Sequence, residues 1–376
     1  MEFINLKRQY ERLKTQIDKN IREVITQSAF IGGRFINELE EKLAAYVGRK
    51  HCISCDNGTT ALQLAYMAYG LGERDVVFCP DMTFIASAEP AYMLGIQVVF
   101  CDIKPDTYNL DPGHLEKQIL RVLSEGKYVP KAVVAVDFLG NPADMEQIAD
   151  ICKKYNMILI EDAAQSMSAE YKGKKCGSFG EISCTSFFPS KPLGGYGDGG
   201  ACFTDDDEVA EVIRSMKVHG KGKDKYDNVR VGLNARLDHI QAAVLLPKLS
   251  VLEEELELRQ AVAKRYDEAF RGKLQIPYIE ACGKSSYAQY CVLTKSEEQR
   301  SRLIQGLKEN DIPSLIYYPK CMHEQKVFRY MEAGGAYGGF PNAERYAVCN
   351  LGLPFSPYLT KEEQEKVIRT VLHIFS

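Results

Sequence analysis

Hydrophobic positions in the first seventy residues change between helical and strand-like spacing. From Leu6 to Val24, apolar residues recur at every third or fourth position, which predicts an amphipathic helix that ends near Gly32 and Gly33. A second helical pattern covers residues 35–46. Residues 52–55 form a short apolar run typical of a buried strand, and residues 61–69 again have helical spacing.

The same alternation continues to about residue 217. Short runs rich in β-branched residues predict strands at residues 76–79, 98–101, 132–136, 157–160, 182–187 and 201–204. Helical spacing predicts helices at residues 84–94, 112–120, 143–155 and 206–217. Strands that alternate with helices predict an α/β fold with a mainly parallel sheet sandwiched by helices.

The last third of the chain has a different pattern. A long helical pattern covers residues 237–270 and contains Pro247, where we expect a kink or break. A β-rich run at 287–293, a helix at 297–310 and a terminal helix opened by a capping box at 360–363 fit a smaller α+β unit. We therefore expect an N-terminal arm and large domain at residues 1–248, and a small domain at residues 249–376.

Composition narrows the class of protein. The chain has 376 residues, of which 45% are hydrophobic and 26% charged, as in ordinary globular proteins. A net charge of -4 gives no general attraction to nucleic acid or anionic lipid. No apolar run approaches the ~20 residues of a membrane span. The polar first residues and scattered cysteines indicate reduced thiols and a cytoplasmic location.

One glycine-rich motif and one cysteine motif resemble known functional motifs but lack the context that those functions require. The sequence G-x-G-x-x-G at 195–200 leads into a strand-like run, whereas the dinucleotide fingerprint requires a following helix. Cys52 and Cys55 form a C-x-x-C pair without a second pair nearby, so they are interpreted as core cysteines. The six histidines have no ligand spacing, and no metal site is expected.

Lys191 is the strongest candidate for covalent chemistry. It follows Phe187 and Phe188, lies between Pro189 and Pro192, and precedes a glycine-rich turn. An amine that is partly desolvated there would have a lowered pKa and would attack a carbonyl as Schiff-base lysines do. The stretch alone is equally compatible with a loop lysine beside a turn.

Two further features complete a pattern. Gly58 and Thr59 begin a helix after a strand, which makes an anion site suited to phosphate or an ordinary N-cap. Asp162 follows an apolar run and could pair with a cationic ring nitrogen or cap a helix. Pyridoxal 5'-phosphate requires an anion site, a carboxylate and a lysine, so the order of these features favours that cofactor.

The chain resembles the sugar-nucleotide aminotransferases of the DegT/DnrJ/EryC1/StrS family, a branch of fold-type I pyridoxal phosphate enzymes. The resemblance covers essentially the whole length and rests on segments 57–62, 161–166, 186–194, 197–200, 232–237 and 241–243. It implies fold type I, a homodimer with shared active sites, and transfer of an amino group from L-glutamate to a nucleotide-linked keto sugar for glycan or surface polysaccharide biosynthesis.

The resemblance also implies roles for residues around the cofactor ring. Lys191 would form the Schiff base and move the proton during transfer, and Asp162 would pair with the ring nitrogen. Gln165 would contact the ring hydroxyl, while Phe84 would stack on the ring face. These two catalytic residues and two ring contacts would form the centre of the site.

Phosphate and substrate contacts are implied in the same way. Gly58, Thr59 and Ser186 would bind the cofactor phosphate, and Asn234 would reach it from the partner subunit. Facing the sugar, the resemblance implies four substrate contacts: Arg236, His219, Tyr317 and Tyr318.

The sugar itself is less narrowly defined. The motifs FFPSKPLG-x-YGDGGA and RVG-x-N-x-RLD resemble members that aminate C3 of UDP-2-acetamido-3-keto-glucuronate. Those members have His-Tyr-Pro where this chain has Tyr317-Tyr318-Pro319. Another UDP- or dTDP-linked 3-keto or 4-keto sugar therefore stays open, as does a pyridoxal phosphate-dependent sugar dehydratase, although retention of Lys191 disfavours dehydration.

Overall fold

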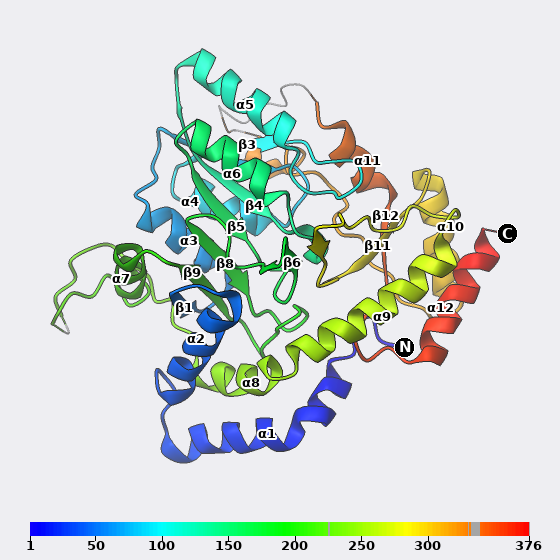
Figure 1. The fold of residues 1–376 in the computed structure, drawn as a ribbon, viewed down its shortest axis with the longest axis horizontal. Helices are drawn as coiled ribbons and strands as arrows, with labels where there is room; N and C mark the ends of the chain where they lie inside the picture. Colours follow the sequence, from blue (N-terminus) through cyan, green and yellow to red (C-terminus); the bar gives the residue numbers. More distant parts are fainter. Residues whose placement is uncertain (225, 330, 332–338, 376) are drawn as a thin grey trace.

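A seven-stranded sheet forms the centre of the N-terminal part of the computed structural model (Figure 1). The strand order is β1-β9-β8-β5-β4-β2-β3, and only β9 runs against the others. Its strands are β1 (His51–Cys55), β2 (Asp75–Pro80), β3 (Gln97–Cys101), β4 (Val129–Val136), β5 (Ile158–Asp162), β8 (Ile182–Ser186) and β9 (Gly200–Thr204). The structure describes residues 1–224, 226–329, 331 and 339–375.

Helices cover both faces of this sheet. Val77 and Cys79 of β2 belong to a core shared with α3, α4 and α7, whereas Val76 and Phe78 belong to a core shared with α5 and α6. This division follows from the two-residue period of a strand. The covering elements are α3 (Gly58–Ala68), α4 (Glu89–Met93), α5 (Pro112–Glu125), α6 (Met145–Lys154), α7 (Asp207–Met216) and the 3₁₀ turns η1 (Ile85–Ser87) and η2 (Phe138–Gly140). The predicted α/β sandwich is confirmed.

A third core joins the N-terminal arm to the β1 edge of the sheet. It contains Val24, Leu39, Phe203 and Leu245, all less than one-tenth exposed. The helices that supply it are α1 (Leu6–Gln27), α2 (Arg34–Val47) and α8 (His239–Leu249), which lie together below the sheet in Figure 1. The arm is therefore part of the packed structure and not a loose extension.

The helix break expected at Pro247 lies elsewhere, so that detail of the prediction is wrong. Helix α8 continues through Pro247, and α9 (Leu252–Phe270) begins after Ser250. Proline lacks the N–H that would bond the carbonyl of Ala243. The side-chain amide of Asn20 in α1 donates to that carbonyl instead, at 3.0 Å, so the helix tolerates proline.

The C-terminal part is a smaller α+β layer around a two-stranded antiparallel sheet. Its elements are β11 (Tyr290–Leu293), α10 (Glu297–Glu309), η3 (Lys326–Phe328), α11 (Pro341–Cys349), β12 (Asn350–Leu353) and α12 (Lys361–Ile374). Helix α9 extends from α8 toward α10 and α12 (Figure 1). The capping box of Thr360 and Glu363 is confirmed. The boundary after residue 248 stays a prediction.

A second small sheet links the two parts of the chain. Its order is β10-β6-β7, with β6 (Glu170–Tyr171) and β7 (Lys174–Lys175) in the N-terminal half and β10 (Gly283–Lys284) beyond α9. The chain's beginning also reaches the C-terminal part, because the N–H of Phe355 donates to the carbonyl of Phe3 at 3.0 Å. These contacts hold the two parts against each other.

The cysteines behave as core residues. All twelve are unpaired, and Cys52 and Cys55 are buried in β1, as predicted. Among the helices of the described residues, none is both long and apolar enough to cross a membrane.

Candidate active site

Lys191 lies in the loop between β8 and β9 and is half-buried. Its backbone N–H donates to the carbonyl of Phe188 at 2.9 Å. Burial lowers the pKa of the Lys191 ammonium to about 8, while the negative charge of Asp162 opposes the shift. A substantial fraction of the side chain is therefore the neutral, nucleophilic amine near neutral to mildly basic pH.

Asp162 ends β5, the middle strand of the sheet, and is buried. Its Oδ2 accepts a hydrogen bond from the hydroxyl of Ser87 at 2.7 Å, and its Oδ1 accepts one from the N–H of Ala164 at 3.1 Å. Burial raises the pKa of this carboxyl, and these two donors and Lys191 oppose the rise. The carboxylate is thus fixed at the carboxyl edge of the sheet, where ligands of α/β proteins bind.

Ser87 is a site residue that the sequence reasoning missed. It is buried in η1, and its hydroxyl lies 2.8 Å from that of Thr83. Since Ser87 donates to Asp162, Thr83 donates to Ser87. The only signal in the sequence is a pair of hydroxyl residues around Phe84, which has no distinctive spacing.

The start of α3 faces the end of β8. A Cβ atom added to Gly58 would lie 2.8 Å from the Cβ of Ser186, so only glycine permits this approach. The side chain of Asn57 caps the N–H of Thr60 at 2.8 Å. Within the part of the chain that the structure describes, the N–H groups of Gly58 and Thr59 have no acceptor. The structure therefore brings Gly58, Thr59 and Ser186 together around open donors.

Gln165, Phe84 and Tyr318 lie around the same region. The Gln165 side-chain oxygen accepts from the N–H of Leu139 at 2.6 Å, which leaves its NH₂ group for contacts on the other side. That group lies 3.4 Å from the Tyr318 hydroxyl. The rings of Phe84 and Tyr318 are 5.8 Å apart, and Phe84 is 52% exposed. Phe84 and Tyr318 thus form an aromatic pair beside the free NH₂ group of Gln165.

The other predicted substrate contacts differ in exposure, and the Tyr317 ring lies 5.9 Å from that of Tyr318. His219 and Asn234 are exposed, on the segment that follows α7 and extends away from the sheet (Figure 1). Arg236 is half-buried, and its Nε has no hydrogen-bond partner among the described residues. Tyr317 packs against Phe3, with ring centres 6.2 Å apart. The single chain thus presents His219 and Asn234 outward.

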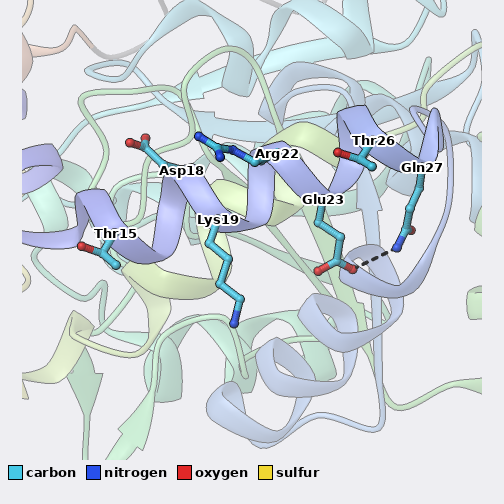
Figure 2. A pocket seen from close by; sticks show the side chains of 7 residues that line it. All are labelled: Thr15, Asp18, Lys19, Arg22, Glu23, Thr26 and Gln27. Carbon is cyan, nitrogen blue, oxygen red and sulfur yellow. Dashed lines mark hydrogen bonds between the residues drawn. The ribbon is translucent and has the colours of Figure 1, made fainter.

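A separate hollow on the surface shares none of these residues. It has a volume of about 520 Å³ and lies on α1, where polar side chains project outward (Figure 2). All of its lining residues belong to one helix: Thr15, Asp18, Lys19, Arg22, Glu23, Thr26 and Gln27. A single helix cannot enclose a ligand, so this is an open polar surface.

Asp81, Cys321 and His323 are close enough together to be considered as metal ligands. However, Asp81 already accepts from the backbone N–H of His323 at 2.8 Å and from its Nδ1 at 2.6 Å. This carboxylate, at the end of β2, anchors residues 321–323 to the sheet. The expectation that the chain has no metal site stays a prediction.

Comparisons with known proteins agree with this geometry. A model of the DegT/DnrJ/EryC1/StrS aminotransferase family matches residues 11–372. The chain is 44% identical, over 96% of both chains, to UDP-2-acetamido-2-deoxy-3-oxo-D-glucuronate aminotransferase of Pseudomonas aeruginosa. These matches extend over both parts of the chain.

Solved structures share the complete fold. A DegT DnrJ EryC1 StrS aminotransferase from Brucella abortus is 41% identical, with a TM-score of 0.97 and 100% of both chains covered. The Bacillus subtilis protein ntda, solved with bound cofactor pmp, is 25% identical, with a TM-score of 0.88 over 100% of this chain and 85% of that one. The α/β sandwich, the lysine loop and these matches together show that the chain belongs to the DegT/DnrJ/EryC1/StrS family of sugar aminotransferases.

Proposed function

We propose that this protein uses pyridoxal 5'-phosphate to transfer the amino group of L-glutamate to a nucleotide-linked keto sugar. The best candidate acceptor is UDP-2-acetamido-3-keto-glucuronate, aminated at C3. The observation that carries the proposal is the convergence of a half-buried lysine, a buried carboxylate and the open N–H groups of a helix start at one edge of the sheet.

The residues at this edge fit the cofactor. Glycine at position 58 keeps the space beside Ser186 open, where a Cβ would fill it. The N–H groups of Gly58 and Thr59, which have no acceptor among the residues that the structure describes, lie at the positive end of α3 and suit a phosphate. When bound, pyridoxal 5'-phosphate supplies an aldehyde that joins an amine and a ring that accepts the electron pair of the substrate carbon.

The chain's own groups provide acid–base chemistry. The amine of Lys191, with its pKa lowered to about 8, accepts a proton at Nζ and returns it to a neighbouring atom. Asp162 holds a negative charge for a ring N–H, because Ser87 and Ala164 donate to its two oxygens. Gln165 presents its NH₂ group to a ring hydroxyl, and Phe84 covers one ring face.

A homodimer completes the site in this proposal. Asn234 and His219 are exposed, and apolar residues near them in the chain are exposed as well, including Val231 at 81%. Phe188 in the lysine loop is 51% exposed. A second subunit that covers these residues would bring Asn234 to the partner's cofactor phosphate. The exposure of these groups in the single chain supports this arrangement.

Arg236 is the proposed partner of the sugar carboxylate. Its guanidinium has a fork geometry that binds carboxylates with two hydrogen bonds, and its Nε has no partner among the residues that the structure describes. Burial raises the pKa of Tyr317 to about 12, so this phenol stays neutral and adds no positive charge. The uronate proposal therefore depends on Arg236.

The acceptor is tested by supplying glutamate with UDP- and dTDP-linked 3-keto and 4-keto sugars and identifying products by mass spectrometry. We expect an amino sugar from the UDP-linked 3-keto uronate at the highest kcat/KM, and a loss of at least tenfold with Arg236→Met. Faster amination of a neutral 4-keto sugar would contradict the uronate assignment. A deoxy sugar without incorporated nitrogen would indicate a dehydratase.

A further inference from the structure

The turn that follows Lys191 rests on helix α8. The ammonium of Lys248 donates to the carbonyl of Gly194 at 2.6 Å. Lys248 is only 2% exposed, and its Nζ lies 4.3 Å from the centre of the Tyr196 ring, within the range of a cation–π contact. A buried lysine that bonds a backbone carbonyl is uncommon, because burial of the charge is costly.

A second α8 residue holds the same turn. The side-chain oxygen of Gln241 accepts from the N–H of Tyr196 at 2.8 Å. A Cβ at Gly195 would lie 2.8 Å from this oxygen, and a Cβ at Gly197 would lie 2.8 Å from the Gln241 nitrogen. The glycines that resemble a dinucleotide motif therefore make room for Gln241.

These two side chains lie on one face of α8. Gln241 and Lys248 are seven positions apart, about two helical turns. Inside the loop, the N–H of Lys191 bonds the Phe188 carbonyl and the N–H of Gly195 bonds the Phe187 carbonyl. Those internal bonds fix the shape of the loop, whereas α8 fixes its place relative to the sheet.

We propose that Gln241 and Lys248 are positioning residues for Lys191, because they hold the 194–197 turn and so set where the reactive amine lies. The inference rests on the proposed function, in which Lys191 joins the cofactor. Neither residue touches the reacting atoms; each acts through the loop backbone.

The charge of Lys248 is compensated within the same region. Burial lowers the pKa of Lys248 to about 8, and the carboxylate of Glu255 opposes that shift. Glu255 is buried and accepts from the side-chain amide of Gln9 at 2.9 and 3.0 Å. Glu255 lies on α9, so this contact ties α9 to α1, while Asn20 of α1 bonds the Ala243 carbonyl of α8 itself and supports the helix under the turn.

The test measures how fast pyridoxal 5'-phosphate becomes trapped on Lys191 by borohydride, read at the Lys191 peptide by mass spectrometry on the full chain. Lys248→Met removes the donor to Gly194, and we expect trapping to slow at least about tenfold, because a displacement of a reactive group by about 1 Å can cost up to about 100-fold. Lys248→Arg keeps a donor and should recover most of the rate.

Arg259→Met is the matched control. Arg259 is also buried, also lies close to Glu255, and donates to the carbonyl of Tyr287 at 3.0 Å, away from the loop. We expect it to lower the urea midpoint as Lys248→Met does while trapping stays within about twofold of the wild type. Equal slowing in both variants would show a general structural effect and overturn the inference.

Gln241→Ala decides the question if Lys248→Met fails to fold. It removes only the acceptor for Tyr196 and should also slow trapping, whereas an unchanged rate would overturn the inference. Unchanged trapping in Lys248→Met would do the same. Absence of any trapping in the wild type would instead overturn the proposed function, and this inference with it.

Discussion

Ser87 determines how Asp162 presents its charge. Its hydroxyl donates to Oδ2 of a buried carboxylate, so Ser87→Ala leaves that oxygen short of one donor. We expect about 1–3 kcal/mol weaker cofactor binding, measured as the dissociation constant of pyridoxal 5'-phosphate by absorbance titration. Aminotransferase activity at limiting cofactor should fall as cofactor binding weakens.

Thr204→Val is the control for this prediction. It also removes a buried hydroxyl, which donates to the carbonyl of Glu181 at 3.0 Å on the far edge of the sheet. It should cost stability without a change in the dissociation constant. If Ser87→Ala binds the cofactor as tightly as the wild type, the assigned role of Ser87 is wrong.

The lowered pKa of Lys191 predicts a pH dependence. Because the folded-state pKa is about 8 and the ordinary value is 10.5, burial costs stability while the amine is charged, and that cost disappears as pH rises from about 8 to 10.5. In the folded protein the neutral amine accumulates as pH rises toward about 8 and predominates above it. Trapping of pyridoxal 5'-phosphate at Lys191 should therefore rise about tenfold per pH unit below pH 8 and level off above it.

Exposed lysines in the same samples serve as the comparison. Lys154 is more than half exposed, and its hydrogen bond to Glu116 raises the pKa of its ammonium, so its trapping should keep rising through pH 9. If Lys191 shows the same continued rise as Lys154, its amine is not desolvated and its assignment as the reactive group loses its physical basis.

Among single residues, the sequence identified several members of the site but not the contacts between them. Lys191, Asp162 and Gly58 were found because each interrupts a regular pattern at the end of a strand or the start of a helix. Ser87 was not found, because a serine between strands has no distinctive spacing. Tyr317 also shows the limit, since its packing against Phe3 joins residues from opposite ends of the chain.

Among the elements, α1 and α8 share a hydrophobic core and are also joined by a hydrogen bond. Asn20 donates to the Ala243 carbonyl that Pro247 leaves without a donor. Asn20→Ala should lower the free energy of unfolding by about 1–2 kcal/mol, because a buried carbonyl loses the donor that replaces the missing N–H of Pro247. Urea denaturation measures this loss.

Two comparisons separate this bond from general effects on α1. Gln27→Ala changes an exposed amide on the same helix and should stay within about 0.5 kcal/mol of the wild type. In a Pro247→Ala background, where the backbone N–H is restored, Asn20→Ala should cost markedly less. An equal cost in both backgrounds would contradict the account.

Helices and strands were predicted correctly where the hydrophobic periodicity is strong. They were missed or misplaced where tertiary contacts determine the bounds of an element. The strands at residues 76–79 and 132–136 belong to longer observed strands, β2 and β4. The expected helix at 84–94 is divided into η1 and α4, with Pro90 at the start of α4. Strand β12 went unpredicted because its partner β11 lies far away in the chain.

For the whole molecule, the proposed sharing of the site between two subunits predicts complementation. If Asn234 serves the partner's site, mixed dimers of Lys191→Ala and Asn234→Ala chains contain one complete site. Co-refolded equal mixtures should regain about a quarter of wild-type activity, although each variant alone has little, since about half of randomly formed dimers are mixed.

The control mixes Lys191→Ala chains with Asp162→Asn chains. If one chain supplies both Lys191 and Asp162 to the same cofactor, each site in a mixed dimer lacks one of these two groups. In that case a mixed dimer has no complete site and activity stays at the level of the separate variants. If the mixture of Lys191→Ala and Asn234→Ala chains also regains no activity, Asn234 acts within its own chain or has no role in the site.

At this scale the order of strands and helices predicted the α/β sandwich, because alternation along the chain determines the layers. It did not predict how the C-terminal part meets the sheet. The contact of His323 with Asp81 joins positions far apart in the chain, and neither residue interrupts a pattern.

The central claim is that Lys191 joins pyridoxal 5'-phosphate and passes an amino group from glutamate to a sugar. The most direct measurement is the visible absorbance of the purified full chain with pyridoxal 5'-phosphate before and after addition of L-glutamate. We predict a yellow band that L-glutamate removes and a nucleotide-linked keto sugar restores, with neither change in Lys191→Ala. A chain that stays colourless with added cofactor, or a band that L-glutamate leaves unchanged, would contradict the account.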